Sequence, residues 1–550
     1  MRLEHLIFSE QQSSSVMRNL TAAATLAIAL VMPQASAEEI SAEAPQVQVD
    51  SGALRGKLAQ ANGVALHEFL GIPYAAPPLG ALRWKPPQSV AHWRDVRDAQ
   101  KFGPRCMQLP LFSDMVFRSD GMSEDCLYLN VWTPASAGAK KRPVLVYFYG
   151  GGYQGGDGSE PRYDGASLAS TGIVTVTLNY RLGAFGFMAL PALAKESPRH
   201  VTGNYGLLDQ NAALRWVKAN IARFGGDSAQ ITIAGESSGS ISVNAHMASP
   251  LSRGLIARGI GESGALIAPI APQSLADAEQ RGKTFMRQVH ASDLLALRAL
   301  PAAELLQATA AKDAPTFDAD IDGYFLTETP AATFARGTQA KIPLLLGANS
   351  QEGFYTQLLQ QGEPTPANYR AAMEKLFGKQ AERALALYPG SSEDEVKRSA
   401  TALASDIFIA HSTWRWMDLQ RRTGHAPVYF YYFAQPRPVK TKHAPGDAPD
   451  SGAVHSGEIE YALGNLDGNP VYAWTPDDRI ASHTMQGYFA QFIKTGNPNA
   501  AGLPHWPAVS ESDGGLLRQT IDAHTRTEVD RGAARQAFLQ QYFTTHSAPF

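Results

Sequence analysis

A glycine-bounded serine is the segment of this chain whose residue types most clearly suggest chemistry. The segment Gly235–Gly239 reads GESSG, follows the apolar run Ile231–Ala234 and precedes Ile241–Met247, which favours helix. Between a buried strand and a helix, the glycines permit a sharp turn that lifts a serine hydroxyl off the end of a sheet. The helix N-terminus then favours the negative charge that develops during attack. We therefore predict that Ser237 is a nucleophile; a plain Gly/Ser turn is the alternative.

A second glycine run offers hydrogen-bond donors for that chemistry. The segment Tyr149–Tyr153 reads YGGGY and closes a predicted strand, Val144–Tyr149. Glycines at a strand end leave backbone N–H groups uncovered, and uncovered N–H groups are what an oxyanion hole requires. Taken alone, the run is equally consistent with a flexible turn, but beside a predicted nucleophile it favours an oxyanion hole.

The elements that must position these residues form an alternating pattern. Further apolar or β-branched runs have the length of parallel strands buried on both faces: Ile173–Leu178, Pro343–Gly347 and Val428–Phe433. One helical stripe ends at Gly225 and Gly226: Leu208, Ala212, Trp216 and Ile221. Strands alternating with helices predict an α/β sheet. The Ala-rich stretch Ala271–Ala340 predicts helices that form an insertion or cap, not a separate domain.

The first 37 residues read as a signal peptide. Arg18 precedes an apolar run, Leu20–Met32, and Ala35–Ala37 is a small-residue cleavage site. Met17 is a candidate for the true start, because the residues before it are partly acidic. We expect an exported protein, periplasmic or secreted, without stable membrane insertion after cleavage; an uncleaved anchor is the alternative. Residues 38–550 are then expected to form a single domain.

Composition narrows the function classes. The 550 residues carry a formal net charge of −3, so there is no electrostatic reason to expect nucleic-acid binding. Two cysteines exclude a disulfide-built scaffold and a Cys-rich zinc site, and we predict neither a metal ion nor a cofactor. Export permits a disulfide between Cys106 and Cys126. Two reduced, buried thiols are the alternative.

Eight ordered segments resemble type-B carboxylesterases of the carboxylesterase/cholinesterase family. They are 71–80, 123–132, 146–153, 179–187, 224–239, 262–265, 455–464 and 494–499. The resemblance implies an α/β-hydrolase fold, with a mostly parallel central sheet, helices on both faces and large helical insertions. The interval between the cysteines lacks the tryptophan that cholinesterases use for choline, and no glycosylation sequon follows the leader. Both features favour a bacterial exported member of the family.

The same resemblance implies a Ser–His–Glu triad of Ser237, His455 and Glu352. In this fold the nucleophile, acid and histidine follow one another in that chain order. Glu352 comes just after the predicted strand Pro343–Gly347, and His455 opens the family segment HSGEIEY. Eight histidines lie beyond Glu352, and His443 is the alternative base. Because the base must be neutral, we expect activity to rise with pH through an ionisation in the ordinary histidine range.

The resemblance also implies supporting groups. The expected oxyanion donors are the backbone amides of Gly151, Gly152 and Ser238. The family usually has alanine where Ser238 stands, but that difference leaves the amide unchanged. A polar network around the histidine is expected from Glu236, Ser263 and Glu458, with ordinary polar packing as the alternative. Seven residues past Ser263, Ile270 suggests a roomy or aliphatic acyl pocket.

The expected function is hydrolysis of a small-molecule carboxylic ester through an acyl-enzyme. The same triad also suits other acyl bonds: lactone, carbamate, amide or polyester. A non-catalytic binding protein on the same fold is the rival from another class, but such relatives lose triad residues that this chain retains.

One loop bears on the substrate. The Pro-rich segment Gln435–Asp450 carries four basic side chains: Arg437, Lys440, Lys442 and His443. We expect a solvated surface loop; a loop that overhangs the site and attracts anionic esters is the alternative.

Overall fold

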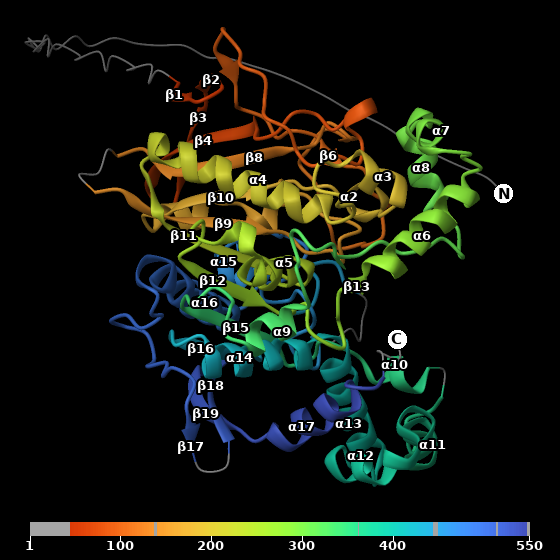
Figure 1. The fold of residues 1–550 in the computed structure, drawn as a ribbon. Coiled ribbons are helices and arrows are strands. Elements are labelled where there is room, and N and C mark those ends of the chain that lie inside the picture. Colours follow the sequence, from red (N-terminus) through yellow and green to blue (C-terminus); the bar gives the residue numbers. More distant parts are fainter. Residues whose placement is uncertain (1–43, 137–139, 361, 444–448, 513–514, 547–550) are drawn as a thin grey trace, which may run out of the picture. The chain divides into compact units, whose positions relative to one another are not determined.

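A large mixed sheet forms the centre of the computed structural model (Figure 1), which describes residues 44–136, 140–360, 362–443, 449–512 and 515–546. Along the sheet the strands follow the order β17-β18-β16-β15-β12-β11-β9-β10-β8-β4-β3, with β19 paired to β18. The strands from β10 to β18 in this order pair in parallel, whereas the outer strands at both ends pair antiparallel. This is the expected α/β-hydrolase architecture. The expected leader, residues 1–37 with Met17, lies outside the described residues.

The bounds of the strands follow. The large sheet contains β3 (Lys57–Ala61), β4 (Val64–Pro73), β8 (Tyr128–Pro134), β9 (Arg142–Phe148), β10 (Val174–Leu178), β11 (Gly226–Glu236), β12 (Arg258–Glu262), β15 (Leu344–Asn349), β16 (Val428–Phe433), β17 (Glu511–Ser512), β18 (Gly515–Ile521) and β19 (Arg526–Asp530). Three small sheets contain β1 (Gln46–Val49), β2 (Gly52–Arg55) and β5 (Arg97–Asp98), then β6 (Arg105–Cys106) and β7 (Met122–Ser123), then β13 (Gln273–Ser274) and β14 (Asp320–Ile321).

Helices cover both faces of the large sheet. Before strand β15 the chain contributes α1 (Ala166–Ser170), α2 (Gly183–Phe187), α3 (Pro191–Glu196), α4 (Tyr205–Asn220), α5 (Ser238–Ala248), α6 (Leu275–Gln288), α7 (Leu294–Ala299), α8 (Ala302–Ala308) and α9 (Pro330–Ala335). After β15 it contributes α10 (Tyr355–Leu359), α11 (Pro366–Phe377), α12 (Ala381–Leu387), α13 (Glu393–Ser405), α14 (His411–Thr423), α15 (Ile459–Leu463), α16 (Pro476–Thr495) and α17 (Ala533–Tyr542).

Side-chain contacts show which helices lie on which face. His246 of α5 stacks on Phe148 of β9, and Trp416 of α14 fills the space left by Gly261 of β12. On the opposite face, Phe489 of α16 packs against Tyr431 of β16. The central strands therefore have no solvent-exposed face, which explains why their sequences read as continuous apolar runs.

The predicted runs correspond closely to strands. Val428–Phe433 matches β16 residue for residue, and the other predicted runs overlap β9, β10, β11 and β15. The helical stripe belongs to α4, which ends as predicted: a short 3-10 turn leads to Gly225 at φ 80°, and Gly226 already begins β11.

Two helical regions flank the sheet. Residues 271–340 contain α6 to α9, as expected, and their buried Phe285 and Leu297 pack into the same hydrophobic core as the sheet. Helices α10 to α13 and α17 instead share a second core, which includes Tyr369, Met373 and Phe538. The resemblance implied large helical insertions, but no pattern in the sequence placed this second helical core.

Cys106 and Cys126 form a disulfide, with 5.0 Å between their Cα atoms. The bond closes a 20-residue loop, which in the chain-entropy model stabilises the fold by about 3 kcal/mol. The alternative of two reduced thiols is therefore not what the structure shows. Among the helices in the described ranges, none has the length and apolar composition required to cross a membrane.

Candidate active site

Ser237 occupies a strained turn between strand β11 and helix α5. Its backbone lies at φ 54° and ψ −121°, a conformation that L-residues rarely adopt and that costs of order 1–3 kcal/mol. Two hydrogen bonds hold the turn: the Ser237 N–H donates to the Glu262 carbonyl at 2.8 Å, and the Ile241 N–H donates to the Ser237 carbonyl at 2.9 Å. The turn predicted from GESSG is thus present, with the serine at its apex.

The glycines on either side of Ser237 are required by close backbone approach. A Cβ atom on Gly239 would lie 2.0 Å from the Phe148 carbonyl oxygen, and one on Gly235 would lie 2.6 Å from the same oxygen. Neither contact is possible for a larger residue without moving the end of β9. The motif therefore has a steric explanation in this chain.

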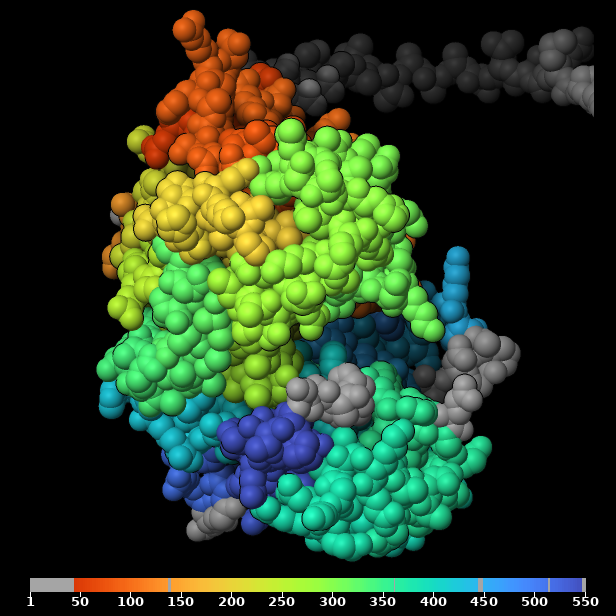
Figure 2. Space-filling model, turned by 45° about the vertical axis from the view of Figure 1, so that its right-hand side comes forward, coloured from red at the N-terminus to blue at the C-terminus, as the bar shows by residue number. Residues whose placement is uncertain are grey.

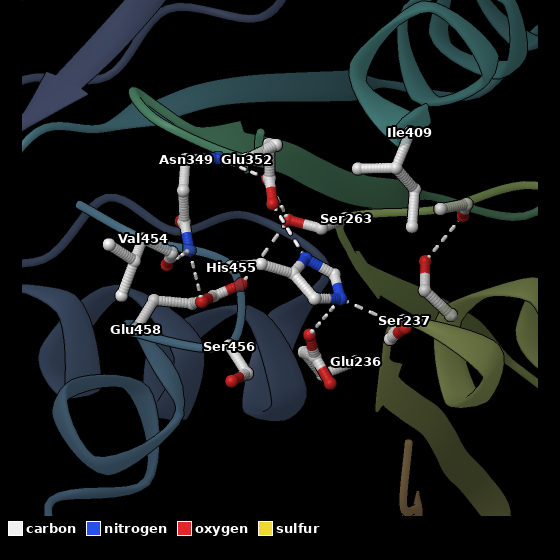
Figure 3. A network of polar contacts seen from close by, with 12 residues as sticks. Glu236, Ser237, Ser263, Asn349, Glu352, Ile409, Val454, His455, Ser456 and Glu458 are labelled. Atoms are coloured by element: carbon white, nitrogen blue, oxygen red, sulfur yellow. Dashed lines mark hydrogen bonds and ion pairs between the residues drawn. The ribbon is translucent and has the colours of Figure 1, made fainter. Parts of the chain in front are cut away.

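His455 joins Ser237 to Glu352 (Figure 3). The His455 Nε2 atom lies 3.0 Å from the Ser237 Oγ atom, and the His455 Nδ1 atom lies 2.6 Å from the Glu352 Oε2 atom. The three residues are separated by 218 and 103 positions in the chain, so only the fold brings them together. The ring of Phe408 packs edge-on against the imidazole at 4.9 Å and limits its rotation.

The loops after β15 and β16 are clipped together, and this places the acid beside the histidine. The Gln351 N–H donates to the Ala453 carbonyl at 2.8 Å, and the Asn349 side-chain amide donates to the Val454 carbonyl at 2.8 Å. Glu352 directly follows Gln351 in one loop, and His455 directly follows Val454 in the other. The distance between Glu352 and His455 is therefore fixed by the hydrogen bonds that join the two loops.

The second oxygen of Glu352 is also held. Ser263 Oγ donates to Glu352 Oε1 at 2.5 Å, and the Asn349 N–H donates to the same oxygen at 2.6 Å. Glu458 lies on the far side of Ser263, at 3.4 Å, and accepts a short hydrogen bond from the Asn349 side-chain amide. With the histidine, these bonds give the Glu352 carboxylate three hydrogen-bond donors, which fix its position.

The glycine run borders the same site. Gly151 and Gly152 have φ values of 115° and 61°, which favour glycine, and a Cβ atom on Gly151 would lie 2.3 Å from the Gly155 carbonyl oxygen. Both glycines and Ser238 line one cavity with Ser237 and His455. The structure thus brings together the predicted triad residues, the predicted oxyanion donors and the expected polar network.

This cavity measures about 530 Å³ and is lined mainly by apolar side chains. They include Phe112, Met115, Leu266, Ile270, Phe408 and Ile409. Figure 2 shows the surface hollowed between the α6–α8 segment and helices α10 to α13, and the lining residues come from beside both regions. Four charged residues that no sequence pattern singled out also line the cavity: Asp114, Arg162, Arg281 and Asp318. They lie in separate loops and helices, so no local spacing signals them.

Comparison with known proteins identifies the family. The model of the "Carboxylesterase family" matches residues 43–538. The chain belongs to the carboxylesterase family. It is 36% identical to a fumonisin B1 esterase of Sphingopyxis macrogoltabida, over 80% of this chain and 81% of the relative. It is also 36% identical to a para-nitrobenzyl esterase of Bacillus subtilis (82% and 90%) and 35% identical to a cocaine esterase of Oryctolagus cuniculus (83% and 88%). The chain is accordingly a carboxylic ester hydrolase.

The electrostatics of this carboxylesterase differ from the sequence expectation in one respect. Burial lowers the pKa of the His455 imidazole, but the carboxylates of Glu236 and Glu352 outweigh it and raise the pKa to about 9. Glu236 Oε1 lies 3.3 Å from His455 Nε2, and burial raises the pKa of Glu236 to about 8. Activity should therefore rise at a higher pH than an ordinary histidine would give.

The loop Gln435–Asp450 is only partly the solvated loop that was expected. Lys440, Lys442 and His443 are exposed, and His443 Nδ1 bonds the Lys440 carbonyl at 2.8 Å. Arg437 is instead 5% exposed and pairs with the buried Glu460 at 2.9 Å. The expectation was wrong for Arg437, because burial beside a carboxylate makes it part of the fold. His443 does not line the cavity of Ser237.

Replacing Glu236 tests the electrostatic origin of the raised histidine pKa. Glu236→Gln removes the charge that raises the pKa of His455 most, so the acid limb of kcat/KM should move to lower pH. The measurement is a pH profile of kcat/KM for a neutral ester, followed by pH-stat titration. Asp318→Asn is the matched control, since Asp318 lines the same cavity but does not contact His455. An acid limb that stays in place or moves to higher pH in Glu236→Gln would contradict the assignment.

Proposed function

We propose that Ser237, His455 and Glu352 form the catalytic triad of this carboxylesterase. The observation that supports this most is the unbroken chain of two hydrogen bonds, 3.0 Å and 2.6 Å, that ends at a serine on the wall of the cavity. Backbone strain of this kind is typically found at functional sites, so the strained serine favours an enzyme over a non-catalytic binding protein. The backbone amides of Gly151, Gly152 and Ser238 are proposed as the oxyanion donors.

In the first half of the reaction, the ester carbonyl carbon is attacked by Ser237. His455 Nε2 takes the hydroxyl proton while Oγ forms the new bond, and the carbonyl oxygen becomes an oxyanion held by the backbone amides. The tetrahedral intermediate then collapses. The bond to the alcohol oxygen breaks, His455 returns its proton to that oxygen, and the acyl group stays on Ser237.

In the second half, water replaces the alcohol. His455 Nε2 takes a proton from the water as it attacks the acyl-enzyme. When the bond to Ser237 Oγ breaks, the carboxylic acid leaves and His455 returns its proton to Ser237 Oγ, which restores the free enzyme. Glu352 accepts the Nδ1–H bond throughout, so Nε2 is the nitrogen left free to accept a proton. Glu352 also stabilises the imidazolium that forms in each half.

The polar groups behind the histidine are proposed to position the acid. Ser263 and the Asn349 amide occupy one oxygen of Glu352, so only its other oxygen faces His455. In its ionised form, Glu236 stabilises the imidazolium beside it. Glu458 restrains Asn349 and Ser263.

The proposed substrates are small-molecule esters with apolar groups, because apolar side chains dominate the cavity. The relatives are named as esterases of fumonisin B1, of para-nitrobenzyl esters and of cocaine, which are three different kinds of substrate. Lactones, carbamates, amides and polyesters remain the alternative acyl bonds.

Export to the periplasm or the medium is proposed from two features. One is the leader pattern of residues 1–37, and the other is the disulfide between Cys106 and Cys126, which persists in oxidising compartments. The domain proposed for the mature chain is residues 38–550.

Alanine variants test the triad. Ser237→Ala and His455→Ala should each lower kcat on a p-nitrophenyl ester by on the order of 10⁴–10⁶, because nucleophile and base act as one unit. His443→Ala is the control and should stay within about threefold of wild type, since its side chain is exposed and outside the cavity. Retention of a tenth of the activity by Ser237→Ala, or loss of activity in His443→Ala alone, would overturn the assignment.

A substrate panel tests the reaction class. We expect neutral p-nitrophenyl esters of rising acyl length to be hydrolysed with a higher kcat/KM than a matched anilide, lactone or carbamate. Compared with the anilide, the ester has the better leaving group, because alcohols leave more readily than amines. Compared with the lactone and the carbamate, the ester offers an alkyl acyl chain that the apolar cavity can bind. A higher kcat/KM for any of the other acyl bonds would move the proposal to that class.

N-terminal sequencing tests export. Mature protein recovered from the periplasm or the medium should begin at Glu38, because Ala35 and Ala37 fit the small pockets of a signal peptidase. A chain beginning at Met17 should export at least as well as one beginning at Met1, because the first 16 residues add two acidic side chains, Glu4 and Glu10, ahead of the apolar run. Protein that retains residues 17–37 and stays in the membrane fraction would show that the segment is an anchor.

A further inference from the structure

Glu262 is a buried acid that the proposed mechanism does not use. It ends strand β12, and its side chain is 0% exposed. It lies opposite Glu236 of β11 in the parallel register, and Gly347 of β15 is paired with both Glu262 and Tyr431 of β16. Registered neighbours in a sheet point to the same face. Glu236, Glu262 and Tyr431 therefore share the face that α16 covers.

Glu262 lacks the set of hydrogen bonds that would stabilise a negative charge. Among the described residues, neither carboxylate oxygen of Glu262 has a hydrogen-bond partner of good geometry, and the same is true of the hydroxyls of Tyr147 and Tyr431. The nearby Tyr147 hydroxyl favours the ionised form of Glu262, but burial and the neighbouring carboxylates outweigh it. Glu352, by contrast, accepts from His455, Ser263 and the Asn349 amide. An ionised carboxylate without such partners is far costlier to bury than a neutral acid.

The groups facing Glu262 are all neutral or acidic. Glu236 faces it from β11, Glu458 from the residue before α15, Tyr147 from β9 and Tyr431 from β16. Burial raises the pKa of Glu262 far above its ordinary value, and the charges of Glu458 and Glu236 raise it further. The cations His455 and Arg162 act on Glu236. Three buried carboxyl groups, Glu236, Glu352 and Glu458, act on the His455 imidazole. Glu262 lies beside Glu236 in the sheet, with only the Tyr147 hydroxyl to offset its burial.

We propose that Glu262 is a neutral carboxylic acid in the working enzyme, linked through water to the hydroxyls of Tyr147 and Tyr431. The acid and the two hydroxyls are polar, buried and without protein partners, which is the setting in which proteins hold internal water. In this form Glu262 is a positioning residue. Its neutral side chain packs beside Glu236 and Glu458 and holds them in place without adding a further negative charge near His455. Only this last effect rests on the proposed role of His455.

The pH dependence of stability tests where the proton lies. An unfolded glutamate ionises near pH 4.3, whereas Glu262 stays protonated in the folded chain, so folding becomes less favourable as pH rises. Glu262→Gln cannot ionise. The unfolding constant of wild type, divided by that of Glu262→Gln, should therefore rise about tenfold per pH unit above that value. Urea unfolding followed by fluorescence at several pH values measures this ratio.

Glu460→Gln is the matched control. Glu460 is also buried, but although burial raises its pKa, Arg437 and Arg162 outweigh burial and the pKa is lowered. The unfolding constant of wild type, divided by that of Glu460→Gln, should stay constant over the same pH interval, because Glu460 is ionised in both the folded and the unfolded chain. A flat ratio for Glu262→Gln as well would show that Glu262 is ionised, and would overturn the proposal. Glu262→Met takes its place if the glutamine variant does not fold.

Two further readouts are independent of stability. Infrared spectroscopy of the wild type at neutral pH should show a protonated carboxyl band that shifts in D₂O and is missing from Glu262→Gln or Glu262→Met; no such difference would refute the proposal. The acid limb of kcat/KM should keep its wild-type position in Glu262→Gln, and a shift to lower pH would show that Glu262 is charged. If Ser237→Ala proved active, the proposed function would fail while the stability and infrared results kept their meaning.

Discussion

The site depends on one close contact between two pieces of backbone. The turn around Ser237 passes so near the end of β9 that glycine is the residue that fits at positions 235 and 239. This contact holds the serine in a strained conformation, at φ 54°, and brings the YGGGY segment alongside it. Because the strain is small beside the core that encloses it, the fold can maintain a reactive geometry that an isolated peptide would abandon.

The loops after β15 and β16 place the other two residues of the site, Glu352 and His455, beside Ser237. They are bonded to each other through backbone and amide groups, so Glu352 and His455 approach along a fixed path. A parallel sheet makes this possible, since its strands end at the same edge and release their loops side by side. Ser237, Glu352 and His455, which are separated by at least 103 positions in the chain, are thereby joined by hydrogen bonds. The same edge also gathers acidic groups, and their buried charge makes the imidazole a stronger base than a solvated one.

Much of this could be predicted from the sequence, for reasons that differ from residue to residue. The strand Val428–Phe433 and the turn at Ser237 have local signals, an apolar run and a glycine frame, that do not depend on distant contacts. Glu352 and His455 have no such signal, and only the resemblance to the family singled them out. The burial of Arg437, the second helical core of α10 to α13 and the isolation of Glu262 result from contacts between distant segments, which no local pattern encodes.

The disulfide loop has a consequence for how such an enzyme diversifies. Cys106 and Cys126 tie both ends of a segment whose interior, including Phe112 and Met115, forms part of the cavity wall. A covalently closed segment keeps its anchorage whatever residues lie between its ends, so substitutions there alter the shape offered to a ligand and leave the reacting atoms where they are. This part of the cavity wall can therefore change in sequence while the positions of Ser237, His455 and Glu352 stay the same. Substrate preference can evolve through such changes without loss of the reaction.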